Sequence, residues 1–395
     1  MKILGLNSGE YNSSAAIFVD GNIVAGAPEE RFNREKLTKD FPEKAIQFCL
    51  NKAKIQYQDL DFVAQAWNPS TYWKKYNPLL SKFRVRREDY FYSLPDNLMN
   101  FSNRKENDWA LMSLPKNSGF PPLYFVSHHR AHAATSYFLS EFDESAILTV
   151  DWKGEFECMT MSKGKGNKIK LLQTQEMPNS LGMLYATYTE LLGYRPNSDE
   201  WKVMALSSFD VEFMSVYEKM RKTLDIDDYG NLELDQSYYQ GGHTKLPKLY
   251  TNKLVKLLGG KEGKIGEDPT EWHLSIAKAM QYLSEEIAII QLIRLYEISK
   301  CENLVVGGGF FMNSVLNGKV LDSTPFKKLY VPYAPADVGN SIGAALFVAH
   351  CLKNENREHS FSSSFIGPEF SKQEIIKVGS RLVERVILKD FQHNL

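Results

Sequence analysis

Short apolar runs separated by polar turns open the chain. Residues 3–6 and 14–19 are apolar and flank the polar stretch 7–12, and a third apolar run covers 23–26. Asp20-Gly21, between the second and third runs, is a dipeptide typical of a tight hairpin turn. The pattern therefore predicts a three-stranded meander at the start of the chain.

The same arrangement recurs from residue 145 onward. Apolar runs at 146–150, 156–161 and 169–173 are separated by polar turns at 151–154 and 164–167. Two similar units that open two halves of the chain predict an internal duplication. The two polar turns would then face each other across a cleft, where backbone N–H groups and carboxylates can hold phosphate and metal.

A long helical periodicity precedes a glycine-rich turn in the second half. Residues 272–300 predict a core helix, since apolar side chains recur at helical spacing: Ile276, Met280, Leu283, Ile287, Ile290 and Ile293. An apolar strand is predicted at 304–306, followed by Gly307-Gly308-Gly309. Glycines between a strand and a helix let a ligand's phosphate or ribose approach the backbone closely.

Composition places the chain among ordinary globular proteins and sets its domain organisation. At 395 residues the chain is long for one core, so we expect a first lobe over 1–140 and a second over 141–352. A linker and a short stub would occupy 353–395. The four cysteines include no CxxC pair, and no apolar run approaches the roughly 18 residues of a membrane-spanning helix. These features favour a soluble, cytoplasmic protein without a membrane partner.

One segment mixes aromatic and basic residues although the net charge of the chain is only −1. It covers residues 67–108, where side chains of both kinds alternate: Trp67, Tyr72, Trp73, Lys74, Lys75, Phe83, Arg84, Arg86, Arg87, Tyr90, Phe91 and Tyr92. Such a mixture suits stacking on bases and tracking of a nucleic-acid backbone. The alternative is an amphipathic insertion that covers one lobe.

Two histidines form the most informative chemical motif. His128 and His132 are four residues apart, so on a helix both rings lie on one face and can reach one divalent cation. Asp151 ends the apolar run at 146–150 and can add an oxygen ligand. The alternative is a partly buried helix whose histidines bond to the backbone.

Several motifs together give the chain a family resemblance. In the first half they are Gly5-Leu6-Asn7 with Ser14-Ala15-Ala16, Glu29-Glu30-Arg31-Phe32 with Arg34 and Lys36, and the HxxxH of His128 and His132. In the second half they are Asp151 with Gly154-Glu155, the run 180–185, Asn197-Ser198 with Glu200, Lys202-Val203-Met204, Gly308 with Asn313, and Asp337 with Gly339 and Gly343. From residue 1 to about 376 the chain resembles the NodU/CmcH family of O-carbamoyltransferases. The resemblance implies an α/β fold of two duplicated ribonuclease-H-like lobes, of the actin/sugar-kinase-like superfamily, with a cleft between them.

The resemblance also implies a reaction and a metal. Family members make carbamoyl-adenylate from carbamoyl phosphate and ATP on a smaller YrdC-like domain, and transfer the carbamoyl group to an acceptor hydroxyl on the large domain. The implied metal ligands are His128, His132, Asp151 and Asp337. The resemblance favours iron(II), with zinc or manganese as alternatives, and ATP would bring magnesium.

Further site residues follow from the same resemblance. The candidates for binding the adenylate are Gly154, Gly182, Glu200, Lys202, Gly308 and Asn313, and the catalytic candidates are Tyr11, Asn12, His128 and Lys202. Glu200 and Lys202 could instead form a structural ion pair. Tyr11-Asn12 replaces the family's usual His-Asp, and tyrosine is a poor base near neutral pH because its ordinary pKa is about 10. Trp152 and Asp199 stand where the family usually has glycines. These replacements either reshape the acceptor pocket or are neutral drift.

The chain ends where the family's YrdC-like domain should begin. Only 27 residues follow Pro368, too few to build a core that binds ATP. We therefore expect a truncated chain or the large subunit of a split enzyme, working with a separate YrdC-like partner. The acceptor hydroxyl is open between a hydroxymethyl-pyrimidine in DNA and a small-molecule natural product or sugar. The other hypotheses are a non-catalytic, nucleotide-binding regulatory relative and a nucleotide-dependent kinase of the same superfamily.

Overall fold

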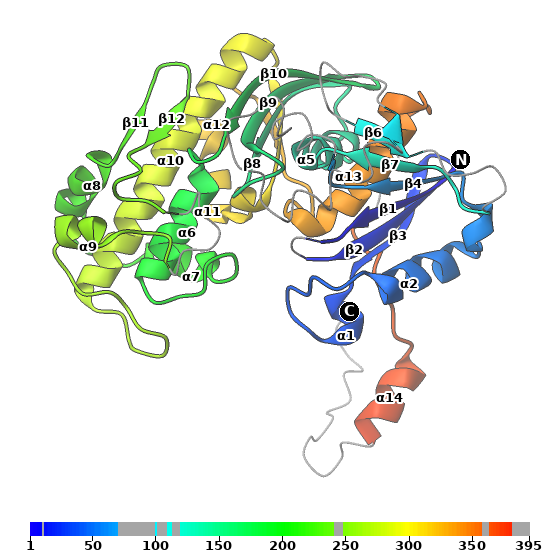
Figure 1. Ribbon diagram of the computed structural model, residues 1–395, viewed down its shortest axis with the longest axis horizontal. Helices are drawn as coiled ribbons and strands as arrows, with labels where there is room; N and C mark the ends of the chain where they lie inside the picture. Colours follow the sequence, from blue (N-terminus) through cyan, green and yellow to red (C-terminus); the bar gives the residue numbers. More distant parts are fainter. Residues whose placement is uncertain are drawn as a thin grey trace.

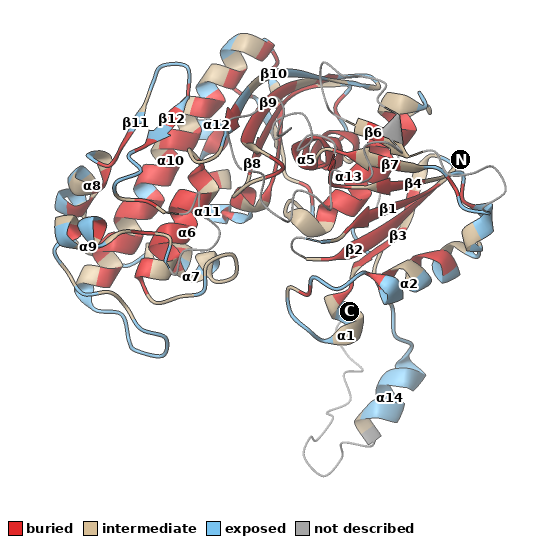
Figure 2. Ribbon diagram, in the orientation of Figure 1, coloured by how far each residue is buried: buried red, intermediate tan, exposed pale blue. Residues whose placement is uncertain are grey.

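In the computed structural model the chain forms two lobes, each built on a β-sheet, that lie side by side (Figure 1). The structure describes residues 1–9, 12–69, 99–100, 109–112, 119–240, 248–357 and 363–380. Buried side chains gather along both sheets and on the helices between them (Figure 2). Most of the aromatic and basic segment 67–108, including Lys74, Lys75, Arg84, Arg86 and Arg87, lies outside the described residues.

The first sheet begins with the predicted meander. Its described strands follow the order β3-β2-β1-β4-β7-β6-β5, where β1 is Lys2–Asn7, β2 Ser14–Val19, β3 Asn22–Pro28, β4 Phe62–Gln65, β5 Met99–Asn100, β6 Trp109–Met112 and β7 Leu123–Val126. The pairs β1/β2 and β2/β3 are antiparallel, whereas β1/β4 and β4/β7 are parallel. Helix α2 (Glu43–Ala53) packs on β2 and β3, and the short α1 (Glu30–Asn33) precedes it.

The second sheet repeats this plan. Its order is β10-β9-β8-β13-β14, where β8 is Glu144–Val150, β9 Glu157–Lys165, β10 Lys168–Glu176, β13 Asn303–Gly307 and β14 Lys328–Tyr330. Three antiparallel strands are again followed by two parallel ones. The strands β9 and β10 run several residues longer than predicted, because cross-strand pairing extends through polar positions as far as Lys165 and Lys168. The two matching sheets confirm the predicted α/β fold of two duplicated lobes.

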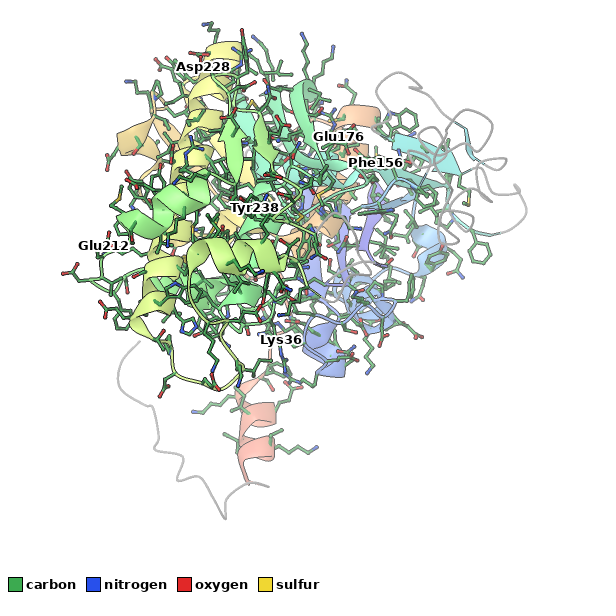
Figure 3. The ribbon with its side chains drawn as sticks, turned by 60° about the vertical axis from the view of Figure 1, so that its left-hand side comes forward. Lys36, Phe156, Glu176, Glu212, Asp228 and Tyr238 are labelled. Carbon is green, nitrogen blue, oxygen red and sulfur yellow. The ribbon has the colours of Figure 1, made fainter. Side chains whose placement is uncertain are left out.

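A helical layer covers the second sheet. The predicted core helix is α10 (Glu271–Ser299), which starts in a capping box between Thr270 and His273. Around it lie shorter elements that the hydrophobic pattern did not predict: α6 (Leu181–Leu191), α7 (Glu200–Leu206), α8 (Met214–Arg221), β11 (Leu224–Ile226), β12 (Leu232–Leu234) and α9 (Asn252–Leu258). Glu212 and Tyr238 lie among them in the second lobe, and Lys36 lies in the first (Figure 3). The turn after β13 continues through η3 (Gly309–Met312), α11 (Ser314–Asn317) and α12 (Val320–Ser323).

Two helices cross between the sheets. α5 (His128–Phe138) comes from the first half of the chain but packs on β8, β9 and β13 of the second sheet. α13 (Asn340–Leu346), which follows η4 (Asp337–Gly339) and runs into η5 (Phe347–Leu352), packs on β1, β2 and β4 of the first sheet. The two helices also pack on each other, so the lobes are joined by an exchange of helices.

Glycines let these helices approach closely. A Cβ on Gly343 of α13 would lie 1.9 Å from the backbone oxygen of Ala131 on α5. A Cβ on Gly5 of β1 would lie 1.9 Å from the backbone oxygen of Ser341. Both contacts are with backbone, so neither can be relieved by a side-chain movement.

We therefore expect Gly343→Ala to destabilise the protein strongly, by about 3 kcal/mol, the upper end of the range for overpacked sites. The free energy of unfolding in urea measures the effect. Gly318→Ala is the matched control, because a Cβ at Gly318 would make only ordinary contacts, the nearest at 3.5 Å. Equal stability of the two variants would show that α5 and α13 can separate without cost.

The C-terminal segment extends away from both lobes. Ile366 accepts a hydrogen bond from Gly26 N at 3.1 Å, next to the edge strand β3. Beyond it, α14 (Lys372–Ser380) is exposed over residues 372–378 (Figure 2). The segment carries apolar side chains that are more than half exposed: Phe365, Phe370, Ile375, Ile376 and Val378. None of the described helices is both long and apolar enough to span a bilayer.

Candidate metal centre

The first turns of α5 place two histidines side by side. His128 and His132 are 3% and 1% exposed, and their Nε2 atoms lie 3.1 Å apart. The helix begins directly after β7, so the i, i+4 spacing turns both rings toward the space between the lobes. The helical pair that the sequence predicted is present.

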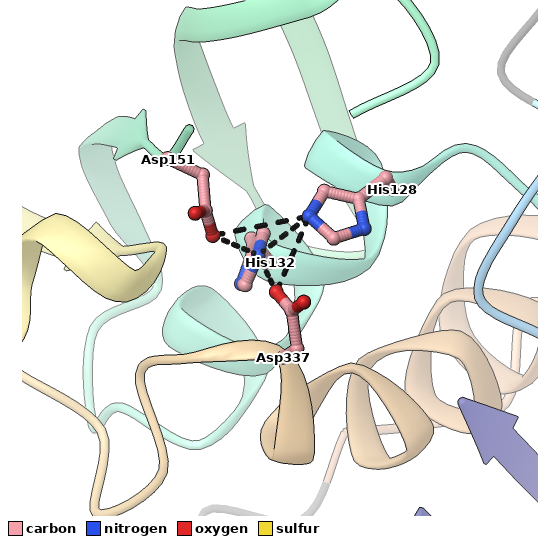
Figure 4. Close-up of side chains that lie close together, drawn as sticks. All are labelled: His128, His132, Asp151 and Asp337. Atoms are coloured by element: carbon pink, nitrogen blue, oxygen red, sulfur yellow. Dashed lines mark hydrogen bonds and ion pairs between the residues drawn. The ribbon is translucent and has the colours of Figure 1, made fainter. Parts of the chain in front are cut away.

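Two aspartates from the second half of the chain complete the cluster. Asp151 follows the last residue of β8, and Asp337 opens η4 just before α13 (Figure 4). Asp151 Oδ2 lies 3.0 Å from His132 Nε2 and 3.8 Å from His128 Nε2. Asp337 Oδ1 lies 3.4 Å from both histidine Nε2 atoms. One atom from each of the four residues lies within 4.8 Å of every other.

This spacing fits a single transition-metal ion. Nitrogen and oxygen ligands lie about 2.0–2.2 Å from such an ion, so neighbouring ligands are about 3.4 Å apart in a tetrahedron and about 3.0 Å apart in an octahedron. The measured separations between histidine nitrogens and their neighbours, 3.0 to 3.8 Å, span these values. Two imidazoles and two carboxylates also form a donor set suited to iron, zinc or manganese.

The electrostatics of the cluster favour positive charge at its centre. Burial by itself would lower the pKa of His128, but Asp337 and Asp151 outweigh burial and raise it to about 9. Burial would raise the pKa of Asp151, but hydrogen bonds from His128 and His132 hold it well below its ordinary value. A divalent cation supplies the same positive charge to the carboxylates while leaving the histidines neutral.

The backbone around Asp151 is tightly packed. Its Oδ2 accepts a hydrogen bond from Gly309 N at 3.0 Å, and its Oδ1 accepts one from Trp152 N at 2.7 Å. Gly308 has φ +93°, and a Cβ there would lie 2.1 Å from Val150 O. A Cβ on Gly182 would lie 2.6 Å from the backbone carbonyl carbon of Asp151. The glycine turn after β13 and the start of α6 therefore both pack on the strand end that positions this ligand.

The other predicted nucleotide-binding residues have structural partners of their own. A Cβ on Gly154 would lie 2.9 Å from the His129 ring and 3.1 Å from His128 Cβ. Asn313 exchanges hydrogen bonds with Gln281, at 2.9 and 3.1 Å, and its Oδ1 also caps α11. Glu200 accepts from Asn197 N at 2.6 Å, and burial raises its pKa.

Lys202 pairs with a different carboxylate from the one expected. Its Nζ lies 3.1 Å from Asp199 Oδ2, and it also lies over the Tyr194 ring at 5.4 Å. The alternative of an ion pair with Glu200 is wrong. The Glu200 carboxylate instead accepts a hydrogen bond from the backbone N–H of Asn197, because the first turn of α7 points this carboxylate back along the chain.

The polar turn after β1 approaches the cluster from the first lobe. Tyr11 lies outside the described residues, and Asn12 has φ +49° with a buried side-chain oxygen. Two residues later, Ser14 Oγ donates to Val338 O at 2.9 Å, next to Asp337. The end of this turn thus lies beside the segment that carries Asp337.

Sequence reasoning gave no role to two buried residues at the site. Glu155 is 4% exposed, and its carboxylate accepts hydrogen bonds from His128 N at 3.0 Å and from Asn68 N at 2.6 Å. Burial, helped by Glu157, raises the pKa of Glu155 to about 7. Asn340, the first residue of α13, is fully buried with its side-chain amide against both histidines. A polar residue that begins an apolar helix was the available signal for Asn340.

Comparison with known proteins defines the class to which this fold and cluster belong. The family model for the carbamoyltransferase N-terminus matches residues 2–346, so the chain belongs to that family. An uncharacterized protein of Synechocystis sp. is 32% identical over 94% of this chain and 62% of its own length. Nodulation protein NolNO of Sinorhizobium fredii is 28% identical over 96% of this chain and 53% of its own length. The chain therefore spans between half and two thirds of these relatives.

Solved structures with similar topology are more distant. Component A of the (R)-2-hydroxyglutaryl-CoA dehydratase of Acidaminococcus fermentans matches 88% of this chain and 97% of its own, with TM-score 0.45 and 11% identity. The ROK hexokinase of Thermus thermophilus matches 88% of this chain and 98% of its own, with TM-score 0.37 and 13% identity.

Proposed function

We propose that this chain is the large, carbamoyl-transferring part of an O-carbamoyltransferase. In this reaction a carbamoyl group passes from carbamoyl-adenylate to an acceptor hydroxyl. The observation that carries the proposal is the His128, His132, Asp151 and Asp337 cluster at the interface of the two lobes, in a chain of the carbamoyltransferase N-terminus family. A non-catalytic relative would have no need of four converging ligands.

The four ligands would hold iron(II), with zinc or manganese as alternatives. When bound, such a cation provides a fixed positive charge for the oxygen that becomes negative during carbamoyl transfer. The chain's own contribution is to orient the ligands, through Glu155 at the start of α5 and through Gly309 N on Asp151. Burial of both histidines keeps water away from their rings and strengthens these interactions.

The adenylate would lie along the second lobe beside the metal centre. The candidates for holding it are Gly154, Gly182, Glu200, Lys202, Gly308 and Asn313. Gly308 and Gly182 support this position because each packs its turn against the end of β8, where a bulkier residue would not fit. Lys202 is partly exposed and lies beside the Tyr194 ring, so it can add positive charge for a phosphate. Catalytic roles for Tyr11, Asn12, His128 and Lys202 belong to the same proposal.

A YrdC-like subunit or domain would make the carbamoyl-adenylate from carbamoyl phosphate and ATP, with magnesium. The chain spans only 53% to 62% of two of its relatives, which leaves room for such a part in the whole protein. The exposed apolar side chains of α14 and of the segment before it offer a surface on which it can pack. Because the reaction uses ATP, we place it in the cytoplasm.

The acceptor hydroxyl would belong either to a hydroxymethyl-pyrimidine in DNA or to a small molecule such as a sugar or natural product. The alternation of cations and aromatic residues over 67–108 favours DNA, since cations bind phosphates and aromatic rings stack on bases. A small neutral acceptor needs no such row of cations.

Mass spectrometry of an acceptor panel tests the proposal. We expect the metal-loaded chain, supplied with carbamoyl-adenylate, to add one carbamoyl group to a hydroxyl in the panel. Hydroxymethylated oligonucleotides form one arm, where binding should weaken as salt rises and in Arg84→Ala/Arg86→Ala/Arg87→Ala. If oligonucleotide binding changed neither with salt nor with the substitutions, DNA would be excluded as the acceptor and small molecules would remain. No carbamoylated product with any acceptor, from a metal-loaded chain, would contradict carbamoyl transfer.

A further inference from the structure

The side-chain amide of Asn340 lies within hydrogen-bond distance of both histidines, although Asn340 is not one of the four ligands. Its Nδ2 lies 3.3 Å from His128 Nδ1 and 3.2 Å from His132 Nε2. The residue is fully buried, and its Oδ1 is buried without a hydrogen-bond partner among the described residues.

The orientation of the amide decides whether it donates a hydrogen bond to the two rings or accepts one from them. The amide N–H groups point at lone pairs of the two rings. One of these, on His132 Nε2, is the lone pair that faces the cluster. A donor there would compete with a cation for the same electrons. Half a turn of the amide exchanges its oxygen and nitrogen with almost no change of shape. The oxygen then faces His128 Nδ1 and accepts its proton.

The arrangement of His128 requires such an acceptor. Its Nε2 is the atom that faces Asp151, Asp337 and His132, at 3.1 to 3.8 Å. An imidazole that gives the Nε2 lone pair to a cation carries its proton on Nδ1. A buried Nδ1–H needs an acceptor, and Asn340 is the partner that the described residues place within reach of it.

We propose that Asn340 is a positioning residue, whose amide oxygen accepts the Nδ1–H of His128 and so fixes the tautomer and orientation of that ligand when metal is bound. A hydrogen bond to the far nitrogen of a metal-bound histidine commonly contributes about 10–100-fold to metal affinity. The inference rests on the metal centre of the proposed function but not on carbamoyl transfer.

Metal affinity, measured by competition with a chelator, tests this role without any turnover. We expect Asn340→Leu, which keeps the volume and removes the acceptor, to bind zinc about 10–100-fold more weakly than the native chain. Asn340→Asp, which keeps an acceptor and has no donor, should bind at least as well as the native chain. If Asn340 acted as a donor that competes with the cation, Asn340→Leu would bind zinc at least as tightly as the native chain, and the proposal would be wrong.

A matched control separates this effect from a general loss of packing. Gln291 on α10 also carries a buried amide, 1% exposed. Its Nε2 donates a hydrogen bond to Gly230 O, and its Oε1 has no partner among the described residues. Gln291→Leu should lose stability as Asn340→Leu does, yet keep native zinc affinity. Equal zinc affinity in the native chain and Asn340→Leu would overturn the proposal.

The tautomer of His128 can be measured in the native protein, so this test does not depend on the folding of a variant. In the zinc-loaded native protein, nitrogen NMR of labelled histidine should show His128 protonated at Nδ1, with slow exchange of that proton. Failure of the acceptor panel would leave this result unchanged, so the two proposals fail independently. Protonation of His128 at Nε2 in the loaded protein would contradict both the ligand assignment and the role of Asn340.

Discussion

Replacing His132 with alanine should abolish metal binding and carbamoyl transfer while the chain remains folded. His132 Nε2 makes the shortest contacts in the cluster, 3.0 Å to Asp151 and 3.1 Å to His128, so its loss removes one ligand and the partner of two others. Because loss of a hydrogen bond to the far nitrogen of a metal-bound histidine already costs about 10–100-fold in affinity, we expect loss of a ligand itself to cost more than about 100-fold. Metal analysis of the purified protein and mass spectrometry of the product measure the two effects. His128→Ala should behave in the same way.

The chain offers a matched control for this substitution. His350 in η5 is as buried as the two histidine ligands, 2% exposed. Its ring packs on Phe18 and Phe138, and its Nδ1 contacts Glu355 O at 2.9 Å. His350→Ala should lower stability but leave metal content unchanged. If His132→Ala kept full metal occupancy and rate, the four-residue cluster would not be the metal site.

The chain by itself should form no product from carbamoyl phosphate, ATP and an acceptor. In the proposed function the adenylate is made by a YrdC-like part separate from this chain, whereas the described lobes contribute the transfer site. Supplying pre-made carbamoyl-adenylate, or a separate YrdC-like protein, should restore transfer from the detection limit to steady turnover. Product formation followed by mass spectrometry, with and without each addition, measures the change.

Two controls define this result. His132→Ala should stay inactive even with carbamoyl-adenylate, because the defect then lies in transfer and not in supply of the donor. The native chain should hold its full complement of metal in every arm, so that a missing ion does not mimic a missing partner. Robust turnover by the native chain from carbamoyl phosphate and ATP alone would exclude the split-enzyme proposal.

The hydrophobic pattern was enough to predict the repeated architecture, because strand and helix periods are local properties of the sequence. The meanders at 3–26 and 146–173 and the helix over 272–300 appear close to their predicted positions as β1–β3, β8–β10 and α10. The short helices between α6 and α9 were not predicted. Their burial depends on packing against α10 and each other, which no window of the sequence contains.

The sequence by itself determined that His128 and His132 share a helix face, since a spacing of four residues requires it. Only the tertiary structure brought Asp337 to them, because α13 crosses to the first sheet and packs on α5 through Gly343. The same crossing places Asn340 against both rings, and the turn after β8 sets Glu155 on the start of α5. These contacts join residues 27 and 212 positions apart in the chain. Such separations are decided by the packing of whole elements, which local periodicity does not encode.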